Sequence, residues 1–256
     1  MNLFCRSIAR KLVWVTLPLV MAFSAVLHAE DTLADHWMVT PKAGEQKTFE
    51  EALKKHLNYR QGKGDPRQWK VYVQVLGENL NTYIIRSCCF KWAEMDQYRQ
   101  WGQDNRTTDH WNDHVKPLVA HASHNFSRLD MVNSHWPEDD SEYQYFGVSQ
   151  MKVKAGHAAS TRSDLATISD HAKEMKWPYF WSWSWQEAGD NTLSLVTPFP
   201  NYAAMESPQT SFFEALKQHL SSESRAQKLI ESWSSHFSDS RYDLYRLRTD
   251  LSMTKP

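Results

Sequence analysis

The sequence predicts an α+β protein whose mature part consists of two tandem βαββαβ domains that cover each other's sheets. Three observations carry this prediction: a repeat at a constant offset, helical patterns that flank both copies in the same order, and an apolar alternation shared by both copies. Trp69–Asp96 aligns with Tyr179–Glu206 without a gap. Self-similarity of this kind is the signature of a repeated structural unit.

The repeat preserves both identities and hydrophobic alternation. The identical positions are Asn81-Thr82 with Asn191-Thr192, Ala93 with Ala203, and Met95 with Met205. A large apolar residue recurs at every second position, and the aligned residues are Val71, Val73 and Val75 in one copy and Trp181, Trp183 and Trp185 in the other. Successive strand residues point to opposite faces, so each copy is predicted to contain a strand with one buried face.

The start of the chain forms a separate segment. A positively charged stretch, Arg6 to Lys11, precedes a nearly continuous apolar run, Leu12–Leu27, that ends beside Ala29. This layout is typical of a secretory signal peptide, so residues 1–29 are interpreted as a leader cleaved near Ala29. The alternative is an uncleaved anchor, for which the run is short. We expect the mature protein in the periplasm or secreted, without stable membrane insertion.

Residues 30–136 are expected to form the first copy. A short strand, Val39–Gly44, precedes a helix capped by Thr48, and the alternating hairpin follows. Beyond the hairpin, an apolar stripe at helical spacing predicts a second helix; its members are Val115, Leu118, Val119, Ala122 and Phe126. An alternating strand then opens at Ser127.

A polar linker, residues 137–142, is predicted to lead into the second copy, residues 143–256. Here the strand Met151–Gly156 ends in the same Lys-Ala-Gly sequence as the first, and a helix is expected after Ser163. After the second hairpin comes another apolar stripe at helical spacing, made of Ala226, Leu229, Ile230, Trp233 and Phe237. The last strand opens at Ser240.

Each copy therefore reads as the ferredoxin-like βαββαβ arrangement, in which both helices cover one face of a four-stranded sheet. The uncovered faces need burial, so the two sheets are predicted to pack sheet to sheet. In this element order and duplication the chain resembles the dimeric α/β-barrel superfamily, which includes antibiotic-biosynthesis monooxygenase-like and NIPSNAP-like domains. The duplicated chain would be a pseudo-dimeric α/β barrel. The resemblance implies a small ligand held between the sheets.

Alternation also divides the hairpins into an apolar face and a mixed face. The mixed face supplies the candidate ligand-binding residues, which are Tyr72, Gln74, Arg86, Ser182, Ser184 and Ser194. An arginine there can pair with a carboxylate or a phenolate, with Tyr72 and Gln74 orienting it. The alternative is that these groups hydrogen-bond across a wet seam between the domains. The three alternate tryptophans are interpreted as core residues, with an aromatic platform for flat ligands as the alternative.

Three functions remain open at this stage. The first is a binding module for a small hydrophobic or aromatic compound. The second, implied by the resemblance, is an enzyme that oxidises or isomerises such a compound. No cofactor is favoured for it, and haem is a variant because chlorite dismutase-like proteins share a doubled fold. That variant would need an axial histidine in the second half, where His171, His219 and His236 are the candidates. The third is a structural or interaction protein.

Other kinds of site are not expected. The formal net charge of -1 offers no basic surface for a nucleic acid. Four histidines, His110, His114, His121 and His124, would share one side of an unbroken helix, but Pro117 interrupts it and no metal site is predicted. Cys88 and Cys89 are adjacent, so an ordinary disulfide framework is excluded because their Cα atoms are too close.

Overall fold

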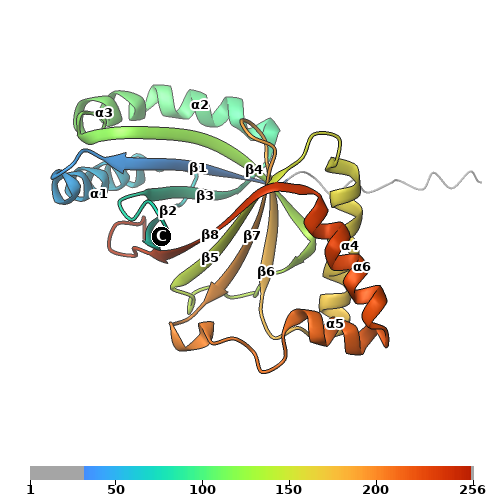
Figure 1. Ribbon diagram of the computed structural model, residues 1–256. Helices are drawn as coiled ribbons and strands as arrows, with labels where there is room; N and C mark the ends of the chain where they lie inside the picture. The colour runs from blue at the N-terminus through green and yellow to red at the C-terminus, as the bar shows by residue number, and fades with distance from the viewer. Residues whose placement is uncertain (1–31, 255–256) are drawn as a thin grey trace, which may run out of the picture. The chain divides into compact units, whose positions relative to one another are not determined.

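A computed structural model describes residues 32–254 (Figure 1). Along these residues a strand, a helix, two strands, a helical segment and a strand follow one another twice. The predicted leader, residues 1–29, lies outside the described residues. No helix among the described residues is long and apolar enough to cross a membrane.

The first half contains four strands and the helices around them. In chain order these are β1 (Thr32–Pro41), α1 (Gln46–Gly62), β2 (Trp69–Leu76), β3 (Tyr83–Phe90), the short η1 (Trp92–Glu94), α2 (Met95–Asp104), α3 (Thr107–His114), the short η2 (Lys116–Leu118) and β4 (Val119–His135). The strand, helix, hairpin and final strand follow in the predicted order.

The second half repeats that order. Its elements are β5 (Tyr145–Val153), α4 (Ala158–Glu174), β6 (Trp181–Gln186), β7 (Thr192–Phe199), the short η3 (Ala203–Met205), α5 (Phe212–Leu220), α6 (Glu223–Ser235) and β8 (Phe237–Leu247). Serine side chains cap the last two helices: Ser211 Oγ accepts the Glu214 N–H at 3.2 Å and Ser222 Oγ accepts the Arg225 N–H at 3.3 Å.

Both long helices begin earlier than their predicted caps. Thr48 and Ser163 lie inside α1 and α4 instead of at their ends. Each helix follows a glycine in the left-handed region, Gly44 at φ +82° and Gly156 at φ +81°. Glycine adopts this conformation without a steric penalty, so the Lys-Ala-Gly turn sets where each helix starts.

The eight strands close into one antiparallel barrel with the order β1-β3-β2-β8-β5-β7-β6-β4. Two seams join the halves, because β2 pairs with β8 and β4 pairs with β6. The predicted α+β class is therefore confirmed, as is the barrel. The predicted sheet-to-sheet packing takes the form of edge pairing: the uncovered faces line one shared interior, and closure leaves no open sheet edge.

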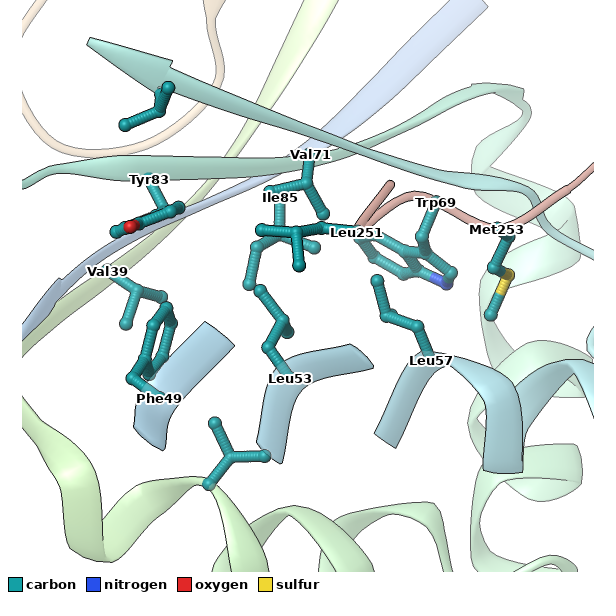
Figure 2. Packing of buried hydrophobic residues seen from close by; sticks show 12 residues of the cluster. Val39, Phe49, Leu53, Leu57, Trp69, Val71, Tyr83, Ile85, Leu251 and Met253 are labelled. Carbon is teal, nitrogen blue, oxygen red and sulfur yellow. The ribbon is translucent and has the colours of Figure 1, made fainter. Parts of the chain in front are cut away.

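Two apolar cores lie outside the barrel wall, one beneath each set of helices. In the first half, Leu53 and Leu57 of α1 pack against Val71 and Ile85 (Figure 2). In the second half the core includes the three alternate tryptophans, Trp181, Trp183 and Trp185, which are buried with Leu165, and the partly buried Trp233 packs against them. These rings are core residues, as predicted, and none forms an exposed platform.

The predicted second helix of the first half is wrong in its position. The helical segment ends at Leu118, and residues 119–135 form the long strand β4. Pro117 lies in the last short turn, where it removes a backbone N–H and prevents the helix from continuing. The apolar stripe that suggested a helix, Val115 to Phe126, thus spans a helix end, a turn and a strand.

The two adjacent cysteines are bonded to each other. Cys88 and Cys89 form a disulfide, with their Cα atoms 3.0 Å apart and a cis peptide bond between them. An ordinary disulfide framework, which was excluded from the sequence, would join distant segments of the chain. The bridge joins neighbours on β3, so it does not link distant segments of the chain.

Gly77 occupies a tight position at the β2–β8 seam. Its φ is +122°, and a Cβ atom there would lie 2.2 Å from both Asp243 Oδ1 and Gln74 Nε2, which are hydrogen-bonded to each other at 2.9 Å. We expect Gly77→Ala to lower the free energy of unfolding by about 1 to 3 kcal/mol. Urea unfolding measures this change.

Gly64→Ala is the matched control for Gly77→Ala. Gly64 also has a positive φ, +71°, but a Cβ atom there meets no neighbour within 4 Å. The difference between the two variants isolates the contact with the seam from the backbone strain. Equal losses in both variants would contradict the assigned role of Gly77.

Candidate functional site

The barrel wall has an outer face covered by helices and an inner face. Alternate residues of the central strands, including Val71, Ile85, Trp183 and Leu193, pack in the outer cores. The residues between them therefore face the interior. All six predicted site residues belong to this inner set: Tyr72 and Gln74 of β2, Arg86 of β3, Ser182 and Ser184 of β6, and Ser194 of β7.

The six residues occupy two parts of the inner face. On β6 and β7, Ser184 lies directly opposite Ser194 in the ladder, with Ser182 one pleat along. On β2, Tyr72 packs edge-on against Phe146 of β5, with ring centroids 5.2 Å apart. Tyr72 and Phe146 join Tyr143 and Tyr245 in an interior aromatic cluster to which both halves contribute.

Gln74 is committed to the seam between the halves. Its amide nitrogen donates to Asp243 Oδ1 at 2.9 Å, and both side chains are buried. For Gln74 the structure thus favours the alternative reading, a hydrogen bond across the junction of the two halves. Tyr72 and Arg86 make no such bond to a described residue.

A row of basic residues crosses the inner face beside this cluster. In the strand register, His36 of β1 pairs with Arg86 of β3, and Arg86 pairs with Lys70 of β2. Directly paired residues share a face, so all three side chains point inward. Lys70 Nζ lies 3.3 Å from Asp140 Oδ2, the one ion pair made by this row among residues 32–254. We call His36, Lys70 and Arg86 the basic row.

Two members of the basic row are left without a polar partner. Arg86 makes no ion pair or hydrogen bond with any described residue. His36 Nε2 is buried and likewise unbonded within the described chain. Burial, with Arg86 and His124 nearby, lowers the pKa of His36 to about 3, so the imidazole is neutral. Burial also lowers the pKa of Arg86 and raises that of Tyr72. The guanidinium is therefore a positive charge in the barrel wall that Tyr72 and Asp140 offset only in part.

His36 was missed from the sequence because the first strand was predicted to start at Val39. The strand starts at Thr32. The signal that could have extended it is the alternation of Trp37 and Val39, which lie on the helix side with the first core.

A second feature is a cavity of about 150 Å³ on the helix side of the first half. It lies between α1, α3 and the outer face of the wall. Its lining is mainly apolar and aromatic, with a few polar groups: Trp37, Leu53, His56, Leu57, Arg60, Trp69, Ile85, Thr107, Thr108 and Trp111. None of the six predicted site residues contributes to it.

His56 is a buried polar group in the lining of this cavity. Its Nδ1 lies 3.1 Å from His110 Nδ1, so one imidazole donates to the other. Burial, followed by the charge of Arg60, lowers the pKa of His56 to about 3 and keeps it neutral. Arg60 itself is paired with Asp65 at 2.6 Å. His56 sits between Leu53 and Leu57 on the buried side of α1, a placement that the helical spacing could have indicated.

The four histidines considered for a metal do not share one side of a helix. His110 and His114 lie on α3, whereas His121 and His124 lie on β4. His124 Nε2 is 2.8 Å from Asp35 Oδ1, and its ring stacks on Trp37. The break at Pro117 explains the separation.

Of the residues considered as haem ligands, His236 does not fit that role. An axial histidine needs a free ring nitrogen that faces an apolar pocket. His236 has both nitrogens bonded, Nδ1 to His157 at 3.1 Å and Nε2 to Asp164 at 2.9 Å. His171 and His219 both contact Glu174 at the partly exposed contact of α4 and α5. None of the three lines the helix-side cavity.

No protein-family model matches the sequence, and no curated protein matches it. Solved structures match it in fold. A proposed monooxygenase from Lactobacillus acidophilus NCFM has a TM-score of 0.52 at 8% identity, covering 89% of this chain and 100% of that one. An anthrone oxidase-like protein scores 0.54 at 6% identity over 86% and 92%. A mutant chlorite dismutase from Candidatus Nitrospira defluvii scores 0.51 at 8% identity over 86% and 92%.

Identities this low bear on the fold and not on the chemistry. The match extends over nearly the full length of those chains, and it agrees with the closed eight-stranded barrel and its two sets of outer helices. The chain has the fold of the dimeric α/β-barrel superfamily that its sequence resembles.

Proposed function

We propose that this chain binds a small aromatic anion, a carboxylate or a phenolate, inside the barrel. The observation that carries the proposal is the unpaired Arg86. Partial burial removes part of the hydration of this guanidinium, and Tyr72 and Asp140 offset that loss only in part, because the pKa of Arg86 is still lowered. A carboxylate or phenolate oxygen would accept its N–H groups and restore the balance.

The surroundings of Arg86 support an aromatic ligand over a simple inorganic anion. Tyr72, Phe146 and Tyr245 form an apolar wall inside the barrel. Ser182, Ser184 and Ser194 provide hydroxyl groups and little bulk elsewhere on the inner face. An eight-stranded barrel is wide enough to hold one small ligand when its inward side chains are small.

The same proposal includes export and duplication. The leader-like residues 1–29 support delivery to the periplasm or outside the cell. The 110-residue offset between Trp69–Asp96 and Tyr179–Glu206, together with the repeated element order, supports descent of the halves from one duplicated ferredoxin-like domain, residues 30–136 and 143–256 joined by the linker 137–142. At this offset Lys70 and Arg86 of the basic row correspond to Phe180 and Val196, so the row belongs to the first copy alone.

Native mass spectrometry of the protein purified from its own host tests the ligand proposal. We expect an added mass on the wild type that is lost in Arg86→Met. Arg246→Met is the matched control, because Arg246 is an exposed arginine on β8, and it should keep the added mass. A bound mass that survives in Arg86→Met would contradict the proposal, and no bound mass in any form would favour a purely structural protein.

A second candidate function is proton abstraction in the helix-side cavity, favoured by the neutral, buried His56. In the tautomer in which His56 donates its Nδ1–H to His110, His56 Nε2 is a proton acceptor toward a ligand O–H. His110 and His114 continue toward the surface, with ring centroids 4.5 Å apart. The fold shared with proteins described as monooxygenases and anthrone oxidase-like fits an enzyme that acts on aromatic hydroxyl compounds.

The neutral state of His56 has a measurable consequence for stability. Its pKa in the folded state, about 3, lies below the ordinary value of 6.5. As the pH falls below 6.5, His56 takes up a proton in the unfolded chain but not in the folded chain. Stability is therefore lost between about pH 6.5 and pH 3. The loss approaches about 1.4 kcal/mol per pH unit for this group. Urea unfolding of His56→Gln at pH 7, 6 and 5 should show a shallower decline than the wild type.

His121→Gln controls for the loss of one imidazole, since His121 is an exposed residue of β4. It should follow the wild-type decline. If His56→Gln also followed the wild-type decline, His56 would take up its proton equally well in both states and could not act as the neutral base proposed.

A further inference from the structure

Helices α4 and α5 bring two imidazoles and a carboxylate together in the second half. His171 and Glu174 are three residues apart in the last turn of α4, and His219 lies near the end of α5. Glu174 Oε2 is 2.9 Å from His219 Nε2 and 3.4 Å from His171 Nδ1. The three ligand-type atoms all lie within 4.8 Å of one another, and theirs is the one such group among residues 32–254.

These atoms have the chemistry and the spacing of a metal site. Two histidines and one glutamate form an established ligand set for Zn²⁺. With metal–ligand distances of about 2.0 to 2.1 Å, two neighbouring ligand atoms of a tetrahedral ion are about 3.3 Å apart. The two separations at Glu174 lie on either side of that value. One ion could therefore bind after small side-chain rotations.

The electrostatics of the group also suit a cation. The Glu174 carboxylate supplies a negative charge, and the two ring nitrogens that face it can bind an ion once they are unprotonated. The lysine nearest along α5, Lys217, is engaged with Glu214 at 2.6 Å. The side chains of His171 and His219 are 22% and 30% exposed, which leaves access for the ion and for a water as fourth ligand.

A second histidine group in the same half does not have the geometry of a metal site. His236 contacts His157 through Nδ1 and Asp164 through Nε2, at 3.1 and 2.9 Å. The two nitrogens of one imidazole point in different directions, so these partners lie on different sides of the ring. The three groups cannot converge on one ion, although their residue types are similar.

We propose that His171, Glu174 and His219 bind a divalent transition metal ion, with Zn²⁺ as the representative ion. The bound ion clamps α5 against the end of α4 and holds the helical cover of the second half in place. This site is independent of the barrel interior and of the helix-side cavity.

Zinc titration of the full chain, expressed without a polyhistidine tag, tests the site. We expect one Zn²⁺ per chain, and a rise in melting temperature of about 5 to 10 °C at a hundredfold excess of Zn²⁺ over the dissociation constant. His219→Gln and Glu174→Gln should each weaken zinc binding at least tenfold while remaining folded, because both side chains are partly exposed. Co²⁺ in place of Zn²⁺ should give the absorption bands of a tetrahedral ion in the wild type alone.

His157→Gln is the matched control, since it removes a histidine from the non-converging group. It should bind Zn²⁺ with the wild-type affinity. The proposal is overturned if the wild type binds no Zn²⁺ at micromolar concentrations, or if the His219 and Glu174 variants bind it as tightly as the wild type does.

Discussion

Replacing Trp183 with alanine is expected to lower the free energy of unfolding by about 3 to 5 kcal/mol. Trp183 is 5% exposed on β6, and its ring meets Trp233 edge-on with centroids 5.5 Å apart. Its Nε1 donates to Ser169 Oγ at 3.1 Å. Alanine would leave a cavity beneath α4 and α6 and a buried hydroxyl without its partner. Urea unfolding followed by circular dichroism measures the loss.

Two further variants separate the contributions to that loss. Trp183→Phe keeps most of the buried ring and removes the bond to Ser169, so it should lose about 1 to 2 kcal/mol. Trp92→Ala removes a tryptophan that is 46% exposed and should lose less than about 1 kcal/mol. If Trp183→Ala were as stable as the wild type, the assignment of the alternate tryptophans to the core would be wrong.

The order of the elements could be predicted because it depends on local periodicity. Alternation at Val71–Val75 and Trp181–Trp185 defines one face of a strand within a few residues, and the flanking stripes repeat the helical spacing. The glycine turns at Gly44 and Gly156 mark the same step in both halves. These signals need no knowledge of the rest of the chain.

The long strand β4 could not be predicted in the same way. Its sequence, from Val119 to His135, alternates weakly and includes several polar residues, since one of its faces packs under short helices and the other lines the barrel. Its conformation depends on pairing with β1 and β6, which lie far away in the chain. The apolar residues of this segment therefore have the spacing of a helix although they lie in a strand.

Only the part of the candidate site that depends on local alternation could be predicted. Strand alternation placed Tyr72, Arg86 and the serines on one face. The basic row, however, exists only through the register in which His36 meets Arg86 and Arg86 meets Lys70. Register is set by long-range pairing and by bulges, such as the one next to Ala34. The helix-side cavity likewise needs α1 and α3 in contact, which periodicity does not reveal.

Arg86→Met is expected to raise the stability of the ligand-free protein by about 1 to 3 kcal/mol. Methionine has a similar length and no charge, so the substitution removes a guanidinium whose charge Tyr72 and Asp140 offset only in part. Most substitutions of buried residues destabilise, which makes the expected sign unusual. Urea unfolding of protein that has been unfolded and refolded to strip any ligand measures the difference.

Once ligand is present, the order of stability should be reversed, and the wild type should be more stable than Arg86→Met. Wild-type protein purified with its ligand gains stability from every contact that the anion makes with Arg86, whereas Arg86→Met has no charge to pair and should unfold identically before and after stripping. Arg246→Met again serves as control and should match the wild type in both states. If Arg86→Met were less stable than stripped wild type, Arg86 would have a structural partner in solution. The charge would then belong to the fold, and the case for an anionic ligand would fail.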